Sequence, residues 1–389
     1  MRQQMMEQFT KLFNTENDIR TFFAPGRVNL IGEHTDYNGG HVFPCALTFG
    51  TYALVALRND QKIQMYSMNF PDVGIISFSI DEGITFKKEH DWANYPKGVI
   101  KEFVDKDVNL GQGFDVLFYG NIPNGAGLSS SASIELATAV ILQGIYETNF
   151  ATVELVKMSQ HAENEFIGVS CGIMDQFAIG MGKENNAILL NCQSLEYQYS
   201  PILLKDASLV IANTNKRRTL ADSKYNERRS ECERALEDLQ KELPIQSLGD
   251  LTPEQFESNR HLIQNEIDQK RAKHAVYENA RTIQAVEKLQ EGDISSFGKL
   301  MCDSHTSLRD DYEVTGFELD TLVEAAMNQA GVIGSRMTGA GFGGCTVSIV
   351  ENDKIEAFIE EVGKSYNEKT GLTAEFYVAS VGDGAKELK

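Results

Sequence analysis

Hydrophobic and polar residues alternate over short stretches in the first half of the chain, and apolar residues follow a helical spacing in the second half. The alternation has a period of two and predicts strands at residues 21–24, 51–58, 63–68 and 114–119. Apolar residues three and four positions apart, or in nearly unbroken runs, predict helices at residues 134–146, 153–167, 222–243, 269–290, 317–330 and 354–366. Two further strands are expected at residues 345–350 and 374–381. This mixture predicts an α+β fold.

The length of 389 residues exceeds one ordinary domain, so we expect two, at residues 1–199 and 200–389. No apolar run reaches the length of a membrane span, and the polar N-terminus lacks the apolar segment of a secretory signal. The six cysteines show no C-x-x-C spacing, which argues against zinc and disulfides and predicts a reducing, cytoplasmic location. The net charge of −20 disfavours a nucleic-acid partner.

A glycine and serine segment at residues 122–132 reads Ile-Pro-Asn-Gly-Ala-Gly-Leu-Ser-Ser-Ser-Ala. A predicted strand precedes it and a predicted helix follows, so its backbone N–H groups and the helix dipole would favour an anion such as a polyphosphate. It is neither a P-loop nor a dinucleotide-binding fingerprint, because no Lys follows the glycines and hydroxyls replace the third Gly. An ordinary turn remains the alternative. One Ser would suffice as an N-cap, whereas three leave hydroxyls for phosphate or a metal.

A second segment, residues 24–40, gathers many hydrogen-bonding side chains in a loop. Between Arg27 and Asp36 it places Arg, Asn, Glu, His and Asp among glycines. Such a mixture of donors and acceptors suits a polyol, because reading a hydroxyl needs both. A solvated polar loop is the alternative. A metal site of Glu33, His34 and Asp36 is disfavoured, because the three lie too close together in a glycine-broken segment.

Three motifs resemble those of a known family. Residues 26–37, Gly-Arg-Val-Asn-Leu-Ile-Gly-Glu-His-Thr-Asp-Tyr, resemble the galactokinase signature. Residues 122–132 resemble the ATP-binding motif of the GHMP kinases, which include galactokinases, homoserine kinases, mevalonate kinases and phosphomevalonate kinases. Residues 334–344, Gly-Ser-Arg-Met-Thr-Gly-Ala-Gly-Phe-Gly-Gly, resemble the third motif of that superfamily. The three occur in the family's order and span most of the chain.

The resemblance implies a two-domain GHMP kinase fold. Its N-terminal domain would resemble ribosomal protein S5 domain 2, its C-terminal domain would be ferredoxin-like, and the active site would lie in the cleft between them. The implied reaction is ATP-dependent phosphorylation of the anomeric hydroxyl of α-D-galactose, which yields galactose 1-phosphate and ADP. The expected partners are therefore galactose and ATP, with Mg²⁺ as the metal, and a monomer is expected.

The resemblance also assigns roles to residues. It implies that Asp175 faces the C1 hydroxyl as the catalytic carboxylate, with Arg27 as its partner. The implied sugar-binding residues are Glu33, His34, Asp36, Asp175 and Tyr225. The implied nucleotide-binding residues are Ser67, Gly125, Ala126, Gly127, Leu128, Ser129, Ser130 and Ser131. Ser131 and Glu163 are the implied Mg²⁺ ligands, and one hydroxyl with one carboxylate is typical of a sparse Mg²⁺ site.

Structural alternatives exist for several of these residues. Arg27 and Asp175 could form an ion pair without a catalytic role, Glu163 could be a solvated helix charge, and Tyr225 could pack in a core. Gly341 and its neighbours could close over a ligand or form a tight turn before the strand at 345–350. No role is assigned to His41, His90, His161, His261, His274 or His305.

Two other functions compete with the expected one. A GHMP kinase for another sugar, such as N-acetylgalactosamine, would need only a roomier pocket around the same loop. A non-catalytic sensor of galactose and ATP would keep binding but lose turnover. The intact serine run and the presence of Arg27, Glu163 and Asp175 disfavour the sensor.

Overall fold

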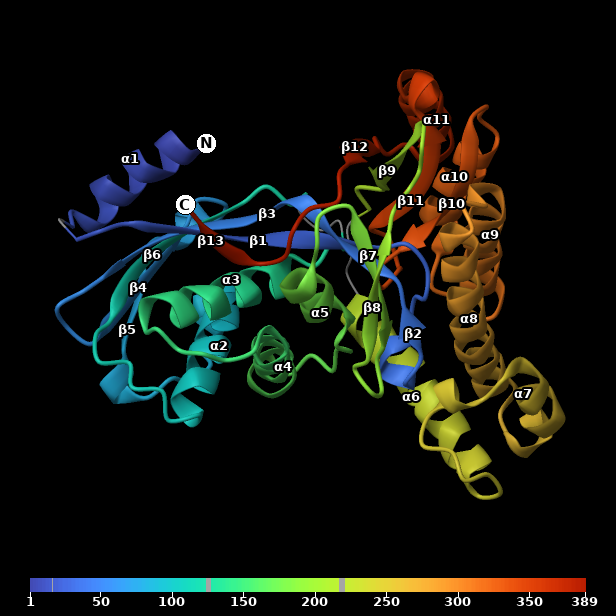
Figure 1. The fold of residues 1–389 in the computed structure, drawn as a ribbon, viewed down its shortest axis with the longest axis horizontal. Helices are drawn as coiled ribbons and strands as arrows, with labels where there is room; N and C mark the ends of the chain where they lie inside the picture. Colours follow the sequence, from blue (N-terminus) through green and yellow to red (C-terminus); the bar gives the residue numbers. More distant parts are fainter. Residues whose placement is uncertain (16, 124–126, 217–220) are drawn as a thin grey trace.

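A six-stranded sheet organises the first half of the chain (Figure 1). The computed structural model describes residues 1–15, 17–123, 127–216 and 221–389. The strand order is β13-β1-β3-β6-β4-β5, and the neighbours are antiparallel except for the parallel pair β4 and β6. The strands are β1 (Arg20–Asn29), β3 (Pro44–Leu57), β4 (Lys62–Ser67), β5 (Ile76–Ser79), β6 (Phe114–Gly120) and β13 (Lys386–Leu388).

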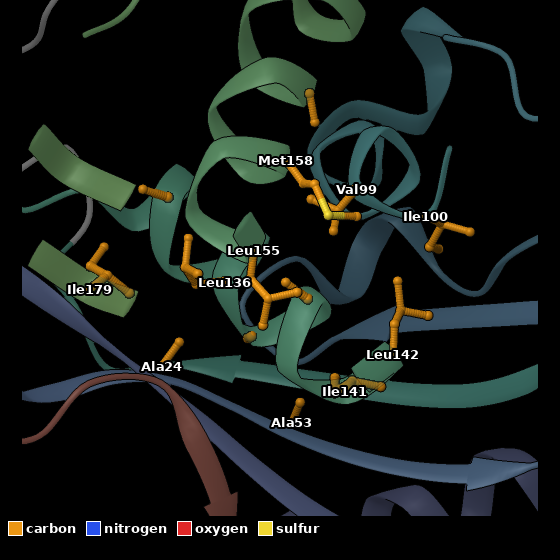
Figure 2. Close-up of a cluster of buried hydrophobic side chains, with 14 of the residues drawn as sticks. Ala24, Ala53, Val99, Ile100, Leu136, Ile141, Leu142, Leu155, Met158 and Ile179 are labelled. Atoms are coloured by element: carbon orange, nitrogen blue, oxygen red, sulfur yellow. The ribbon is translucent and has the colours of Figure 1, made fainter. Parts of the chain in front are cut away.

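Helices cover both faces of this sheet because its central strands are apolar on both sides. Leu54 and Ala56 of β3 pack with α1 (Arg2–Phe13), whereas the alternate residues Ala53 and Val55 face the main core. Figure 2 shows that core between the sheet and the helices on its other face. These helices are α2 (Asn94–Asp105), α3 (Ser130–Ile145), α4 (Thr152–His161) and α5 (Met174–Met181).

A four-stranded antiparallel sheet organises the second half, with the order β10-β11-β9-β12. Its strands are β9 (Ala207–Asn213), β10 (Val332–Thr338), β11 (Cys345–Glu351) and β12 (Glu375–Ala379). The accompanying helices are α6 (Ala221–Gln240), α7 (Pro253–Asn259), α8 (Glu266–Gln290), α9 (Ile294–Asp310), α10 (Gly316–Met327) and α11 (Ile355–Thr370). A small sheet of β2 (His41–Val42), β7 (Asn186–Asn191) and β8 (Tyr197–Pro201) completes the fold.

One hydrophobic cluster joins the two large sheets. Val28 of β1 and Leu47 of β3 belong to the same buried cluster as Ile211 of β9 and Val347 of β11. Residues of α8 and α9 complete that cluster. The end of β1, where the first glycine-containing motif lies, is therefore held against the second half of the molecule.

The long periodic segments form the predicted elements, with adjusted ends. The helix predicted at 153–167 is an α-helix only to His161 and continues as a π-helical turn, Ala162–Ile167. The helix predicted at 222–243 ends at Gln240. The sequence analysis missed several elements, namely α1, α2, α5, α7, α9, β2, β5, β7, β8, β9, β10 and β13.

The domain division and the membrane expectation concern the whole chain. The division at residues 199 and 200 remains a prediction, and β13 returns from the end of the chain to pair with β1. Among the described residues, no helix combines the length and the apolar character that crossing a bilayer would require.

Candidate active site

A bulge near the end of β1 brings the first motif against Leu128, in the segment at residues 122–132 that we call the glycine loop. The register between β1 and β3 shifts between Pro25 and Arg27. A Cβ atom at Gly26 would lie 2.9 Å from the Leu128 carbonyl oxygen, so only glycine allows this approach. The Arg27 backbone N–H donates to the same carbonyl at 3.2 Å.

The Arg27 side chain connects three segments of the chain. Its Nε and Nη2 donate to the two carboxylate oxygens of Asp175 at 2.8 and 3.0 Å, and its Nη1 donates to the Gly127 carbonyl at 2.7 Å. Arg27 is only 4% exposed. Such a bidentate, charge-assisted contact fixes both position and orientation, so Asp175 is held where α5 begins.

Ser129 contributes to the same contact rather than capping its helix. It precedes α3 with a φ of 62°, and its hydroxyl donates to Asp175 Oδ2 at 2.5 Å. The side chain that the sequence analysis placed among the phosphate-binding groups therefore also orients the predicted catalytic carboxylate.

Glu163 lies in the π-helical turn that follows α4, and it faces the start of α3. Gln176 Nε2 donates to Glu163 Oε2 at 2.6 Å and to Glu135 Oε2 at 3.1 Å. The nearby Ser131 hydroxyl acts to lower the pKa of Glu163. Burial, followed by the charge of Asp175, raises the pKa of Glu163 to about 7.

Carboxyl groups outnumber cationic groups in the site, and this fits a divalent cation. Burial and the neighbouring Glu163 raise the pKa of Glu135 well above its usual value, and Glu135 Oε1 is a buried oxygen with no hydrogen-bond partner among the described residues. No group of three or more His, Cys, Asp or Glu residues in the described chain could hold a metal by itself. One hydroxyl and one carboxylate, Ser131 and Glu163, suit Mg²⁺, which takes its other ligands from water and phosphate.

Glu33 joins the first motif to the third. Its Oε1 accepts hydrogen bonds from the Gly339 N–H at 2.7 Å, from the Thr338 hydroxyl at 3.1 Å and from Arg336 Nη1 at 3.4 Å. All the bonds recorded for the Glu33 carboxylate in the described chain use Oε1, so Oε2 is the oxygen that can take a ligand.

His34 lies beside Glu33, with both ring nitrogens engaged. Nε2 lies 3.2 Å from the Ala340 carbonyl and Nδ1 lies 2.7 Å from the Tyr37 hydroxyl. Burial, followed by the charge of His274, lowers the pKa of His34 to about 3, so the ring is neutral. Because a carbonyl only accepts, we assign the single N–H to Nε2, and Nδ1 accepts from Tyr37.

Asp36 and Tyr225 are the remaining predicted sugar-binding residues, and they lie close to the same groups. Burial, followed by the charge of Asp175, raises the pKa of Asp36 to about 7. A Cβ atom at position 172 would lie 1.8 Å from Asp36 Oδ2, so the glycine there is required for this close packing. The Tyr225 ring lies 5.6 Å from the His34 ring and 5.4 Å from the Tyr37 ring, centre to centre.

One cavity of about 340 Å³ gathers all the predicted catalytic and sugar-binding residues, together with Glu163. Its lining includes the predicted residues Arg27, Glu33, His34, Asp36, Glu163, Asp175 and Tyr225. The sequence analysis missed other lining residues, namely Gly168, Val169, Cys171, Gly172, Met174, Asn226, Gly339 and Ala340. Several of these residues are sequence neighbours of predicted site residues, as Met174 is of Asp175 and Asn226 is of Tyr225. Their position in the sequence was the only signal that could have identified them.

None of the described residues that were predicted to bind the nucleotide is among the residues that line the cavity. Gly127, Leu128, Ser129, Ser130 and Ser131 lie at the start of α3. Gly125 and Ala126 lie outside the described residues. Ser67 ends β4 and pairs with Phe118 of β6, two residues before that strand ends.

The third motif forms a turn and also lines the cavity. Gly339 has a φ of 85°, and a Cβ atom there would lie 2.9 Å from the Gly127 carbonyl oxygen. Phe342 lies in the turn that connects β10 and β11, and its N–H donates at 2.7 Å to the carbonyl of Val314, which lies between α9 and α10. The segment therefore forms a tight turn before β11, and its closure over a ligand stays a prediction.

Comparison with known proteins first defines the class. The GHMP kinases N terminal domain matches residues 94–183, and the GHMP kinases C terminal matches residues 285–368. The structure of mevalonate kinase from Methanococcus jannaschii superposes with a TM-score of 0.68 at 20% identity, covering 95% of this chain and 99% of that one. The fold is thus that of a GHMP kinase, as the sequence predicted.

The galactokinase galactose-binding signature matches residues 7–57. Galactokinases from Fusobacterium nucleatum and Bacillus subtilis are each 60% identical, with 100% of both chains covered. The crystal structure of Lactococcus lactis galactokinase in complex with galactose superposes with a TM-score of 0.97 at 49% identity, covering 100% of both chains. The chain belongs to the galactokinase family, and the expected enzyme class, an ATP-dependent sugar kinase, is confirmed.

The buried neutral state of His34 should be visible in the pH dependence of stability. Between pH 6.5 and pH 3 the unfolded chain binds a proton at His34 that the folded chain does not, so stability falls as the pH falls. Each pH unit in this window costs about 1.4 kcal/mol. From pH 7.5 to pH 5.5 we expect the unfolding free energy of the wild type, measured with urea, to drop about 1.4 kcal/mol more than that of His34→Gln. Parallel pH profiles would contradict this assignment.

Proposed function

We propose that the protein transfers the γ-phosphoryl group of ATP to the C1 hydroxyl of α-D-galactose, giving galactose 1-phosphate and ADP. The observation that carries this proposal is the cavity of about 340 Å³. Its lining combines side chains that can hydrogen bond to sugar hydroxyls with the Arg27–Asp175 pair, which adjoins the glycine loop. That volume suits a small polar ligand such as a hexose.

In this proposal Asp175 accepts a hydrogen bond from the attacking hydroxyl. Both Asp175 oxygens already accept from Arg27, and Oδ2 also accepts from Ser129. With both of its oxygens engaged, Asp175 acts mainly by orientation and electrostatics, and takes the proton as the phosphoryl group arrives. A loose phosphoryl-transfer transition state needs little more from a base. Arg27 stabilises negative charge on the transferring group.

The nucleotide side of the proposal rests on the start of α3. Backbone N–H groups of residues 125–131 would bind the phosphates, aided by the helix dipole. Gly127, Leu128, Ser129, Ser130 and Ser131 are the described residues in that role, and Ser67 pairs with Phe118 of β6.

The proposed metal ligands are Ser131 and Glu163. Mg²⁺ held there would neutralise charge on the phosphates. Support comes from the influence of the Ser131 hydroxyl on the pKa of Glu163, which places the two side chains near each other, and from the surplus of carboxyl groups around them.

The proposed sugar-binding residues are Glu33, His34, Asp36 and Tyr225. The free Oε2 of Glu33 and the carboxylate of Asp36 can accept from ring hydroxyls, while Tyr225 can donate or accept. A wrong epimer would leave such buried groups unpaired, which gives strong discrimination.

We also propose a cytoplasmic monomer that binds neither nucleic acid nor membranes. The net charge of −20 and the absence of C-x-x-C spacing in the sequence support this view.

The substrate assignment is tested by comparing ADP release with galactose, N-acetylgalactosamine, arabinose and glucose at saturating ATP and Mg²⁺. We expect galactose to give the highest kcat/KM. A higher value for any other sugar would overturn the substrate. Calorimetric binding of galactose and ATP with no turnover would identify a sensor instead.

Asp175→Ala tests the proposed catalytic role. We expect kcat to fall about 10²- to 10⁴-fold, because the attacking hydroxyl loses its acceptor. Calorimetric binding of galactose and of a non-hydrolysable ATP analogue should remain measurable. Asp175→Asn, which keeps a side-chain oxygen for Arg27, controls for the loss of a buried partner and should also be slow. Turnover near the wild-type rate in either variant would remove the assigned role.

Ser131→Ala tests the metal assignment. The Mg²⁺ concentration for half-maximal rate should rise roughly tenfold, as should the Kd for Mn²⁺ in the presence of the ATP analogue, measured by electron paramagnetic resonance. Thr138→Ala is the matched control, since its hydroxyl bonds the Ile134 carbonyl within α3, and it should change neither value. An unchanged metal requirement in Ser131→Ala would place that hydroxyl outside the coordination shell.

A further inference from the structure

Helix α8 contacts the loop between β1 and β2 (residues 30–40) through side chains to which the sequence analysis gave no role. His274, Glu278 and Thr282 follow one another at intervals of four residues and so lie on one face of the helix. Each of the three has a relative exposure of 0%. With the adjacent Asn279 they form what we call the α8 contact face.

Glu278 binds the loop backbone directly. Its Oε1 accepts from the Gly32 N–H at 3.0 Å and from the Ser304 hydroxyl, and its Oε2 pairs with Arg281. Burial alone would raise the pKa of Glu278, but the charges of Arg281 and Arg336 contribute to lowering it to about 2. Glu278 is therefore ionised, and its bond to the Gly32 N–H is charge-assisted.

His274 binds the loop backbone one residue further along, at the Glu33 carbonyl. Its Nε2 lies 3.1 Å from the Glu33 carbonyl and its Nδ1 lies 2.9 Å from the Ser307 hydroxyl. Burial lowers the pKa of His274 to about 4, so the ring carries one N–H at neutral pH. A carbonyl can only accept, which places that N–H on Nε2 and lets Nδ1 accept from Ser307.

The fit of α8 against the loop depends on a glycine. Gly32 has a φ of 94°, and a Cβ atom there would lie 2.9 Å from the Thr282 hydroxyl oxygen and 2.7 Å from the His41 carbonyl oxygen. Asn279 Oδ1 accepts from the His41 N–H at 2.8 Å, where the loop ends. The α8 contact face therefore holds both ends of the segment that contains Glu33, His34 and Asp36.

A ring stack extends the same contact to His34. The His274 ring lies 4.5 Å from the Tyr312 ring, which lies 4.8 Å from the His34 ring, centre to centre. Tyr312 also hydrogen bonds to Tyr37 at 2.7 Å. Helix α8 thus reaches two adjacent predicted sugar-binding residues, Glu33 through the backbone and His34 through an aromatic ring.

We propose that Glu278 and His274 are positioning residues for sugar recognition: they hold the backbone at the Gly32 N–H and at the Glu33 carbonyl, and so set where the free carboxylate oxygen of Glu33 meets the sugar. Neither is among the described residues that line the cavity, so they act through Glu33 and not by touching the ligand. The inference rests on the proposed function, because it takes Glu33 as a sugar ligand.

Glu278→Gln and His274→Leu test this role. Glu278→Gln weakens one bond to the loop by removing the charge of the acceptor, and His274→Leu removes the other bond by removing the donor. We expect the galactose Kd, measured calorimetrically, to rise roughly tenfold to hundredfold. The Kd of a non-hydrolysable ATP analogue should stay within about twofold, because the glycine loop and α3 are not contacted by these side chains. His274→Gln, which restores an N–H, should recover part of the lost affinity.

Asp268→Asn is the matched control. Asp268 is another buried carboxylate on α8 and pairs with Arg234 at 2.7 Å, away from the β1–β2 loop. It should lower the urea midpoint without changing either Kd by more than about twofold. A merely structural role for α8 predicts the opposite, namely that both affinities follow the loss of stability in all the variants.

The outcomes separate this proposal from the proposed function. An unchanged galactose Kd in folded His274→Leu, or an equal loss of galactose and nucleotide affinity, would overturn the positioning role even if Glu278→Gln did not fold. A wild type that phosphorylates a different sugar would overturn the substrate assignment instead. The same variants would then be measured with that sugar, and a selective loss of its affinity would support the positioning role.

Discussion

The buried charge of Arg27 is the constraint on which the site depends. A guanidinium removed from water needs acceptors for its donors, and leaving it without its partner would cost about 3–5 kcal/mol. The acceptors come from Asp175 of α5 and from the Gly127 carbonyl, which are 148 and 100 positions away in the sequence. Folding the core and assembling the reactive centre are therefore the same event. The glycines at positions 26 and 339 allow the three segments to approach closely enough for this contact.

Around that cation the carboxyl groups outnumber the positive charges. Asp36 and Glu163 have raised pKa values because they are buried near Asp175. The pKa of Glu135 is raised well above its usual value because this residue is buried and neighbours Glu163. Such an arrangement is unfavourable without ligands and becomes favourable when a divalent cation and hydroxyl donors enter. This local balance also explains how a chain with a net charge of −20 can be suited to a polyanionic nucleotide, since screening confines the repulsion of the distant surface.

The sequence predicted the long amphipathic elements and the glycine motifs because periodicity and backbone freedom leave local signals. It did not predict α5, whose eight residues are too few for a clear period, or the π-helical turn that presents Glu163. It also missed His274 and Glu278, because a helical pattern reports that a side chain is buried but not which backbone group it meets. The contact between His34 Nε2 and the Ala340 carbonyl, and the bond from Ser129 to Asp175, join segments far apart in the chain and leave no local trace.

The pairing of β13 with β1 has a consequence for synthesis on the ribosome. Phe22 of β1 is opposite Glu387, and Figure 1 shows the red C-terminal strand along the blue N-terminal one. At about 5–20 residues per second, the edge of β1 waits roughly 20 to 70 s for its neighbour to be translated. During that interval a nascent chain exposes an unpaired strand edge to other chains. The first sheet to emerge is thus the last to be completed.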